Sequence, residues 1–321
     1  MQILKHFLKI IYKNIFLIKE SILDSLIYYK YSVKRKDRRS INEGELMKSI
    51  HSIEKRISFG GKDAEFGKEK ANVVLCYLED NWNNVSFFVL SWGLGTLKQF
   101  GEKILQGEKQ MDFNNRLKKL ELKLPSSLNC QGGTILIENE DIAKKAKSDY
   151  KEFCYSRYSI RNFAGKADLN TIKSAMILSQ KCPSTCNIQP VKGYLINNKR
   201  EINYILSLQN GNRGFTEIVP QLIVLTTRLE LYSEPRERNL CYVDGGIYAL
   251  SLSNALHYYN IGSCILNWAT NSINNSLLHS RLNIPINERV ILLLAIGNIP
   301  KECEVPTSGR RSVDEIFHII N

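Results

Sequence analysis

The chain has 321 residues, which is long enough for one large domain or two ordinary ones, and its 43% hydrophobic content excludes a disordered or fibrous class. A formal net charge of +12 favours anionic partners: phosphorylated cofactors, nucleic acid or an anionic membrane surface. The sequence contains no zinc finger and no aromatic RNA-binding signature, so we do not expect a nucleic-acid partner.

The first thirty residues predict an amphipathic helix. Apolar residues recur at steps of three and four, and lysines interrupt every apolar run before it reaches about 18 residues, so we expect no membrane span. Such a helix either packs on the protein, including a partner subunit, or lies on an anionic membrane surface; we favour packing. The segment has no small-residue cleavage site, which argues against a signal peptide.

The next segment begins with a basic run at 34–39, which predicts a solvated linker. Further along, His51 and Glu54 are three residues apart and share one face of a predicted helix. They form either a polar pair that faces a pocket or a structural contact, and we favour the structural contact.

A composition change marks the expected domain boundary. Residues 107–133 contain a Pro-Ser-Ser stretch and a pair of glycines, which are typical of connecting segments. We therefore predict a helical N-terminal extension over 1–145 and a second domain over 146–321.

Eight cysteines are spread through the chain without a preceding secretory signal, which predicts reduced thiols in a cytoplasmic protein. Cys182 and Cys186 resemble half of a metal site. A second ligand pair at suitable spacing is missing, so we expect no bound metal.

Two arginines and a serine alternate in the segment 157–163. If that segment is extended, Arg157, Ser159 and Arg161 point to one face. Two guanidinium groups around a hydroxyl make a suitable cradle for a phosphate, because their planar donor pairs match phosphate oxygens. On spacing alone, an exposed basic strand explains the same pattern.

A polar loop, 182–190, follows a predicted helix at 168–180. Asp168 is a suitable N-cap for that helix, whose apolar residues fall at helical spacing. The loop combines two prolines with hydroxyl and amide groups that can hydrogen-bond the edge of a planar heterocycle. An ordinary turn uses the same residue types.

The rest of the C-terminal half of the sequence predicts three buried strands, one long helix and two further motifs. The strands are expected at 191–196, 222–226 and 290–296, and the helix at 238–259. In that helix, Gly245 and Gly246 suggest a close approach by another backbone, such as a partner helix. Gly262 fits a helix C-cap.

The last motif, Gly309-Arg310-Arg311-Ser312-Val313-Asp314-Glu315, contains a capping box formed by Ser312 and Glu315. The two arginines precede the start of the capped helix.

In this order, the motifs resemble the FMN-dependent nitroreductase family from about residue 150 to the end. Residues 157–163 match its opening signature, and 183–190 match its Pro-Ser-Ser-x-Asn-x-Gln-Pro loop, with Thr185 in place of the second serine. Residues 260–264 match its Gly-Leu-Gly-Ser-Cys element without the first glycine. The segment 51–67 is similar to the helical extension of nitroreductase-like proteins associated with polysaccharide biosynthesis.

The resemblance implies an α+β fold: a nitroreductase-like mixed sheet flanked by helices, preceded by an α-helical N-terminal region. It also implies an FMN site at a homodimer interface, with the late phosphate-binding arginine mapping to Arg311 and Arg310 a close second candidate. Asn212 and Arg213 align loosely with residues near the flavin pyrimidine, and a polar surface loop explains them equally well. The expected cofactor-binding residues are Arg157, Tyr158, Ser159, Arg161, Pro183, Ser184, Thr185, Asn187, Gln189, Asn212, Gly262, Asn267, Arg310 and Arg311.

The activity that the resemblance implies is electron transfer from NADH or NADPH, through FMN, to a small planar electron-poor acceptor of the nitro, quinone or enone type. No catalytic acid or nucleophile is expected, because the cofactor performs the chemistry. A link to polysaccharide biosynthesis follows from the N-terminal similarity. The alternative is a non-catalytic flavin-fold module whose helical arm docks on a membrane-associated biosynthetic complex, with peripheral contact to an anionic membrane.

Overall fold

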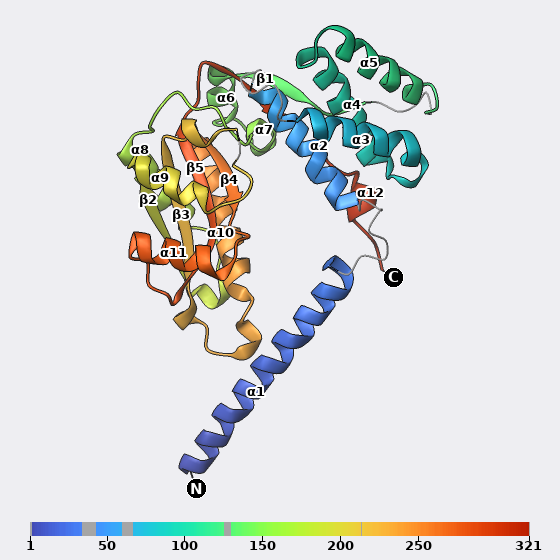
Figure 1. Ribbon diagram of the computed structural model, residues 1–321. Coiled ribbons are helices and arrows are strands. Elements are labelled where there is room, and N and C mark those ends of the chain that lie inside the picture. Colours follow the sequence, from blue (N-terminus) through green and yellow to red (C-terminus); the bar gives the residue numbers. More distant parts are fainter. Residues whose placement is uncertain (1, 34–42, 60–66, 125–129, 213, 321) are drawn as a thin grey trace.

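Helices form the first part of the chain in the computed structural model, which describes residues 2–33, 43–59, 67–124, 130–212 and 214–320 (Figure 1). The basic run 34–39, most of the segment 60–67, the Pro-Ser-Ser stretch and Arg213 lie outside the described residues. The helices of this part are α1 (Gln2–Tyr28), α2 (Glu43–Ser58), α3 (Lys68–Asn81), α4 (Phe87–Lys103) and α5 (Gly107–Glu121).

Helices α2 to α5 share one apolar core. On α2, Ile50, Ile53 and Ile57 recur at helical spacing and are fully buried. They pack in one cluster with Leu78 of α3 and Leu97 of α4. Helix α5 occupies the first part of the segment 107–133, in which we expected a domain boundary.

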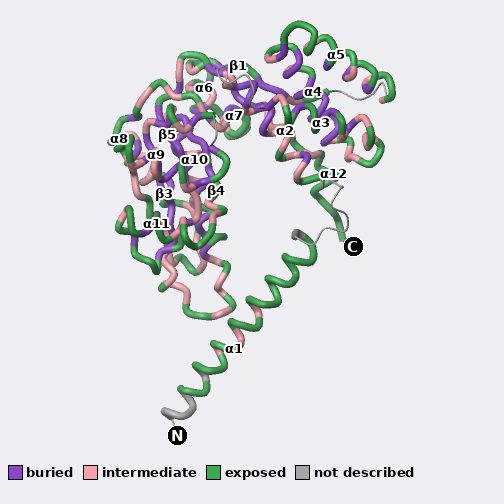
Figure 2. The backbone as a smooth tube through the Cα atoms, viewed as in Figure 1, coloured by how far each residue is buried: buried purple, intermediate pink, exposed green. Residues whose placement is uncertain are grey.

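Helix α1 is the amphipathic helix expected at the start of the chain, and it projects away from the rest of the protein (Figure 1). It contacts the segment 234–238 through charged groups: Lys13 pairs with Glu234 at 2.6 Å, and Arg238 pairs with Asp24 at 2.5 Å. Most of its described apolar residues are exposed (Figure 2). None of the described helices is both long and apolar enough to cross a membrane.

A four-stranded antiparallel sheet organises the second part, with strand order β2-β3-β5-β4. Its strands are β2 (Val191–Ile196), β3 (Gln221–Arg228), β4 (Ile261–Asn267) and β5 (Glu288–Asn298). The helices of this part are α6 (Asn139–Lys145), α7 (Tyr150–Ser156), α8 (Leu169–Ser179), α9 (Lys199–Ser207), α10 (Leu240–Tyr258), α11 (Ser272–Leu282) and α12 (Val313–Ile316).

Both faces of the sheet are covered, which explains why β3 is buried along almost its whole length. One face carries Leu222 and Val224, which cluster with side chains of α9 and α11. The other face carries Ile223 and Leu225, which cluster with side chains of α8 and α10. The two-residue alternation of β3 therefore divides the core into two layers.

The expected α+β class with a helical N-terminal region is confirmed. The three predicted strands correspond to β2, β3 and β5, and the predicted long helix corresponds to α10. Asp168 caps α8 by accepting a hydrogen bond from the backbone N–H of Thr171. The capping box of Ser312 and Glu315 is present at α12.

A second, two-stranded sheet joins the two parts of the chain. Strand β1 (Thr134–Glu138) pairs antiparallel with β6 (Glu302–Pro306), and Ile137 faces Cys303 in the register. Residues 134–145 thus pair and pack with the C-terminal part, although they fall inside the expected N-terminal extension. The boundary at residue 145 stays a prediction.

Gly245 has a packing role within its own chain. A Cβ atom at this position would lie 2.7 Å from Cγ1 of Ile291 on β5, so glycine lets α10 approach the sheet. The neighbouring Gly246 has open space around its Cβ position. Only Gly246 is therefore available for the close approach of a partner helix.

Candidate functional site

A cationic cavity lies between the segment after α7 and the segment after β6. Its volume is about 550 Å³, within the range of about 300–1,000 Å³ typical of small-molecule and cofactor sites. The residues that line it are Gln131, Cys154, Tyr155, Arg157, Tyr158, Ser159, Arg161, Pro306, Thr307, Ser308, Gly309 and Arg310. The cavity thus brings together the arginine–serine motif at the start of the segment 157–163 and Arg310.

Strand β4 holds the arginine–serine motif in an extended conformation through contacts with Ser159 and Ile160. Ser159 forms a parallel bridge with Ser263, and the N–H of Ile160 donates a hydrogen bond of 2.9 Å to the Ser263 carbonyl oxygen. The Ile160 side chain is buried in the interior, whereas the flanking Ser159 and Arg161 line the cavity. The apolar residue therefore anchors the polar ones.

Gly262 permits this close approach. A Cβ atom on Gly262 would lie 3.0 Å from Cγ2 of Ile160 and 3.1 Å from Cγ1 of Ile299, which is tighter than ordinary packing. The C-cap interpretation of Gly262 is wrong, because the left-handed residue after α10 is Asn260, with a φ of 57°, and Gly262 lies within β4.

The arginines of the cavity have no acidic partners within the described residues. Arg157 forms no hydrogen bond or ion pair with any described side chain, and Arg310 donates only to the backbone carbonyls of Ser308 and Gly309. Burial lowers the pKa of Arg157, and the charge of Arg310 lowers it further. Since no carboxylate lines the cavity, the arginines there present positive charge for an anion.

Arg311 lies in a different environment from Arg310. Its guanidinium pairs with Glu43 at 2.6 Å and with Glu315 at 2.9 Å, and it stacks over the ring of Phe88 at 5.4 Å. These contacts join the C-terminal segment to the helical part. Of the two late arginines, Arg310 therefore lines the cavity and Arg311 does not.

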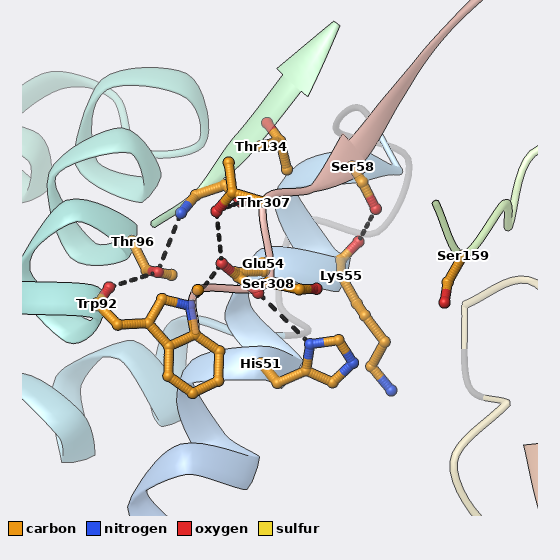
Figure 3. A network of polar contacts seen from close by, with 12 residues as sticks. His51, Glu54, Lys55, Ser58, Trp92, Thr96, Thr134, Ser159, Thr307 and Ser308 are labelled. Atoms are coloured by element: carbon orange, nitrogen blue, oxygen red, sulfur yellow. Dashed lines mark hydrogen bonds and ion pairs between the residues drawn. The ribbon is translucent and has the colours of Figure 1, made fainter. Parts of the chain in front are cut away.

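Helix α2 also contacts the segment that borders the cavity, where Figure 3 shows Glu54 beside Thr307. Nε2 of His51 lies 3.4 Å from the guanidinium of Arg161, and Nδ1 of the same ring lies 3.4 Å from Glu54. The buried Glu54 carboxylate accepts hydrogen bonds from Nε1 of Trp92 at 2.6 Å and from the Thr307 hydroxyl at 3.1 Å. Glu54 thus has a structural role, and His51 reaches a predicted site residue.

A buried histidine lies behind the cavity. Nε2 of His257 is 2.9 Å from the hydroxyl of Ser156, at the end of α7. Burial, and after it the positive charge of Arg157, lower the pKa of His257 to about 4. His257 is therefore neutral at physiological pH and adds no charge to the site.

The polar loop 183–190 borders a second cavity, of about 200 Å³. The backbone N–H and the hydroxyl of Thr185 both donate to the carboxylate of Asp244, which also accepts from the Tyr232 hydroxyl at 2.8 Å. Pro183, Ser184 and Gln189 line this second cavity, whereas Asn187 accepts from Gln189. The two cavities share no lining residue. Within one chain, the polar loop and the arginines therefore border separate cavities.

Asn212 and Asn267 are held in local networks. The buried amide of Asn212 donates to the Leu206 carbonyl at 2.6 Å, and its oxygen accepts from the hydroxyl of Thr216 at 2.8 Å. The side chain of Asn267 accepts from the N–H of Ala269, and its carbonyl oxygen accepts from Gln209. The side chain of Asn212 therefore orders the loop after α9, and the side chain of Asn267 orders the segment after β4.

No protein-family model matches the sequence, and no curated protein matches it. Similar solved structures include a nitroreductase family protein from Streptococcus pneumoniae, 21% identical, with a TM-score of 0.47 over 54% of this chain and 100% of that one. A putative NADH oxidase from Clostridium acetobutylicum is 18% identical, with a TM-score of 0.45 over 53% and 99%. An FMN-dependent nitroreductase from Clostridium difficile is 17% identical, with a TM-score of 0.45 over 53% and 98%.

Proposed function

We propose that this protein is an FMN-dependent oxidoreductase of the nitroreductase type. The observation that carries the proposal is that Arg157, Arg310 and the hydroxyl-bearing Ser159 line one cavity. Neither arginine has an acidic partner among the described residues. Guanidinium and hydroxyl groups are the donors that bind a terminal phosphate, so the donor set fits this cofactor. The order of the sequence motifs supports the same proposal.

When bound, FMN supplies hydride-transfer chemistry, and the protein supplies binding, orientation and electrostatics. Arg157, Ser159 and Arg310 would hold the phosphate, and Arg161 would extend the cationic surface toward α2. The electron donor would be NADH or NADPH. The acceptor would be a small planar electron-poor molecule of the nitro, quinone or enone type, with a role linked to polysaccharide biosynthesis.

A homodimer is part of the proposal, because the polar loop 183–190 and the arginines lie at separate cavities of one chain. An apolar surface suited to a second copy lies on α10 and α8, where Val243, Leu250 and Ile177 are exposed beside the open position of Gly246. Exposed apolar side chains on two packed helices fit an interaction surface. Dimerisation would bring the loop of one chain to the cofactor of the other.

A second candidate function is a non-catalytic flavin-fold module that docks on a membrane-associated biosynthetic complex. The observation that favours it is α1, a helix that projects from the protein and in which most of the described apolar residues are exposed (Figure 2). Reduction by a nicotinamide distinguishes the two functions. An oxidoreductase loaded with FMN is bleached by NADH or NADPH, and the module is not.

The cofactor assignment is tested by titrating FMN with the purified protein and following the quenching of flavin fluorescence. We expect Arg157→Ala and Arg310→Ala each to weaken binding at least tenfold, because each lost charge-assisted hydrogen bond costs about 1.5–3 kcal/mol. Arg311→Ala is the matched control, since it removes the same charge from the next residue. Wild-type protein that binds no FMN, or equal losses at Arg310 and Arg311, would contradict the assignment.

A further inference from the structure

A groove of about 640 Å³ lies beside the cationic cavity, between β1 and the helices α6 and α7. Tyr155 and Tyr158 line both the groove and the cavity. Four consecutive residues of β1, 135–138, form one wall of the groove, and no described residue of β6 lines it. Because successive side chains of a strand point to opposite faces, this wall is the edge of β1 that faces away from β6.

The backbone of β1 pairs with β6 through its odd-numbered residues. The N–H of Thr307 donates a hydrogen bond of 3.0 Å to the carbonyl oxygen of Gly133. At the other end of the strand, the N–H of Asn139 donates one of 2.9 Å to the carbonyl oxygen of Lys301. The backbone groups of Leu136 therefore point to the other edge, which borders the groove. Among the described residues, none forms a hydrogen bond with the N–H or the carbonyl oxygen of Leu136.

A side chain already pairs with this edge at the start of the strand. The amide of Gln99 on α4 accepts a hydrogen bond of 2.6 Å from the N–H of Thr134 and donates one of 2.9 Å to the carbonyl oxygen of the same residue. A neighbouring antiparallel strand makes the same pair of bonds with one residue. The edge is thus complete at Thr134 and open at Leu136, which is 61% exposed. An open edge of this kind is a template for another extended chain.

The groove is acidic, although the chain carries a formal net charge of +12. Glu138 and Glu152 line it and form no ion pair with any described residue, whereas Asp141 pairs with Lys145 at 2.8 Å. Positive charge on a bound segment is therefore favoured, and negative charge is repelled. The exposed ring of Tyr155 adds an apolar surface for the side chains between the charged ones.

We propose that the free edge of β1 binds an extended segment of a partner protein, and that this segment carries basic and apolar side chains. The segment adds a strand to the sheet of β1 and β6 through the N–H and carbonyl oxygen of Leu136, with its basic side chains near Glu138 and Glu152. In strand addition, main-chain hydrogen bonds supply affinity and side-chain contacts supply specificity. The partner then lies beside the candidate cofactor site, because the groove and the cavity share Tyr155 and Tyr158.

The test measures, by fluorescence polarisation, how a fluorescein-labelled peptide of alternating lysine and valine binds to the full-length protein. The control peptide is N-methylated at every peptide bond, which keeps its charge and removes its N–H donors. Leu136→Pro removes the free N–H of β1 without removing a bond to β6, and Leu136→Ala is its matched control. Glu138→Lys reverses one charge of the groove, and Glu140→Lys, at an exposed position of α6 outside the groove, is its control.

We expect methylation of the peptide, Leu136→Pro and Glu138→Lys each to weaken binding about tenfold, whereas Leu136→Ala and Glu140→Lys change it little. Equal binding of the two peptides would show attraction by charge alone and would overturn the proposal, as would a wild type that binds neither peptide. If the lysine–valine peptide dissociates a dimer of the protein in sedimentation, a second copy occupies the groove, and the proposal of a partner protein is wrong.

Discussion

The carboxylate of Glu54 accepts a hydrogen bond of 2.6 Å from the indole nitrogen of Trp92, and both residues are buried between α2 and α4. The same carboxylate accepts from the hydroxyl of Thr307, far along the sequence in the segment that borders the cationic cavity. One acidic residue thus joins two helices of the N-terminal part to the C-terminal segment. Its loss affects both the helical core and the site.

We predict that Glu54→Ala lowers the free energy of unfolding by about 3 kcal/mol, because it leaves buried donors without their charged acceptor. Denaturant unfolding followed by tryptophan fluorescence measures the loss. Glu102→Ala, at an exposed position near the end of α4, is the control and should change stability by less than about 0.5 kcal/mol. Equal stability of the two variants would show that the Glu54 contacts contribute nothing.

The close contact between Gly262 and Ile160 yields a second prediction. Gly262→Ala places a Cβ 3.0 Å from Cγ2 of Ile160, so we expect a loss of about 1–3 kcal/mol in stability and weaker FMN binding as the arginine segment shifts. The double variant Gly262→Ala, Ile160→Ala should recover part of the FMN affinity, because the crowded side chain is gone. Strictly additive effects in this double-mutant cycle would contradict the contact.

His257 predicts a pH dependence of stability. Its pKa falls from 6.5 to about 4 on folding, so the folded state binds fewer protons than the unfolded state between these values. The stability it contributes is present above pH 6.5 and is lost as the pH falls toward 4, in total about 3 kcal/mol. Unfolding measured at pH 7 and pH 4.5 should show a smaller difference in His257→Gln, which cannot titrate. The same difference in both proteins would refute the assignment.

Local patterns predicted the regular elements well. The short β-branched runs became strands because their faces are buried by helices on both sides, and Asp168 caps α8 as its side-chain chemistry requires. The segment 107–133 was expected as a boundary region, and its first part forms α5, where Phe113 and Leu117 supply a buried stripe within a mostly polar sequence. Packing against α4 stabilises that helix more than its composition indicates.

The site was less accessible to sequence reasoning, because its parts come together only in three dimensions. Arg310 and Arg311 are adjacent in the chain, and only the ion pairs with Glu43 and Glu315 distinguish their environments. His51 was expected to make a structural contact, because Arg161, whose guanidinium lies 3.4 Å from its ring, is more than one hundred residues away in the sequence.

The last prediction concerns α1, which touches the rest of its own chain mainly through charged groups. Ile15 and Ile18 are 61% and 60% exposed, so within one chain the apolar stripe is not buried. We expect the helix to pack on a partner subunit, because an uncovered stripe of this length favours aggregation. Deletion of residues 1–28 should then weaken the dimer at least tenfold in sedimentation and lower the melting temperature at low protein concentration.

Ile15→Lys combined with Ile18→Lys keeps the helix and removes only its apolar character, so this variant should weaken the dimer as the deletion does. Lys13→Ala is the control, because its pair with Glu234 is solvent-exposed and contributes about 0–1 kcal/mol. Binding to anionic liposomes in low salt distinguishes the membrane alternative. If the full-length protein binds them, and the truncated protein stays dimeric but no longer binds, α1 is a membrane-surface helix and the packing prediction is wrong.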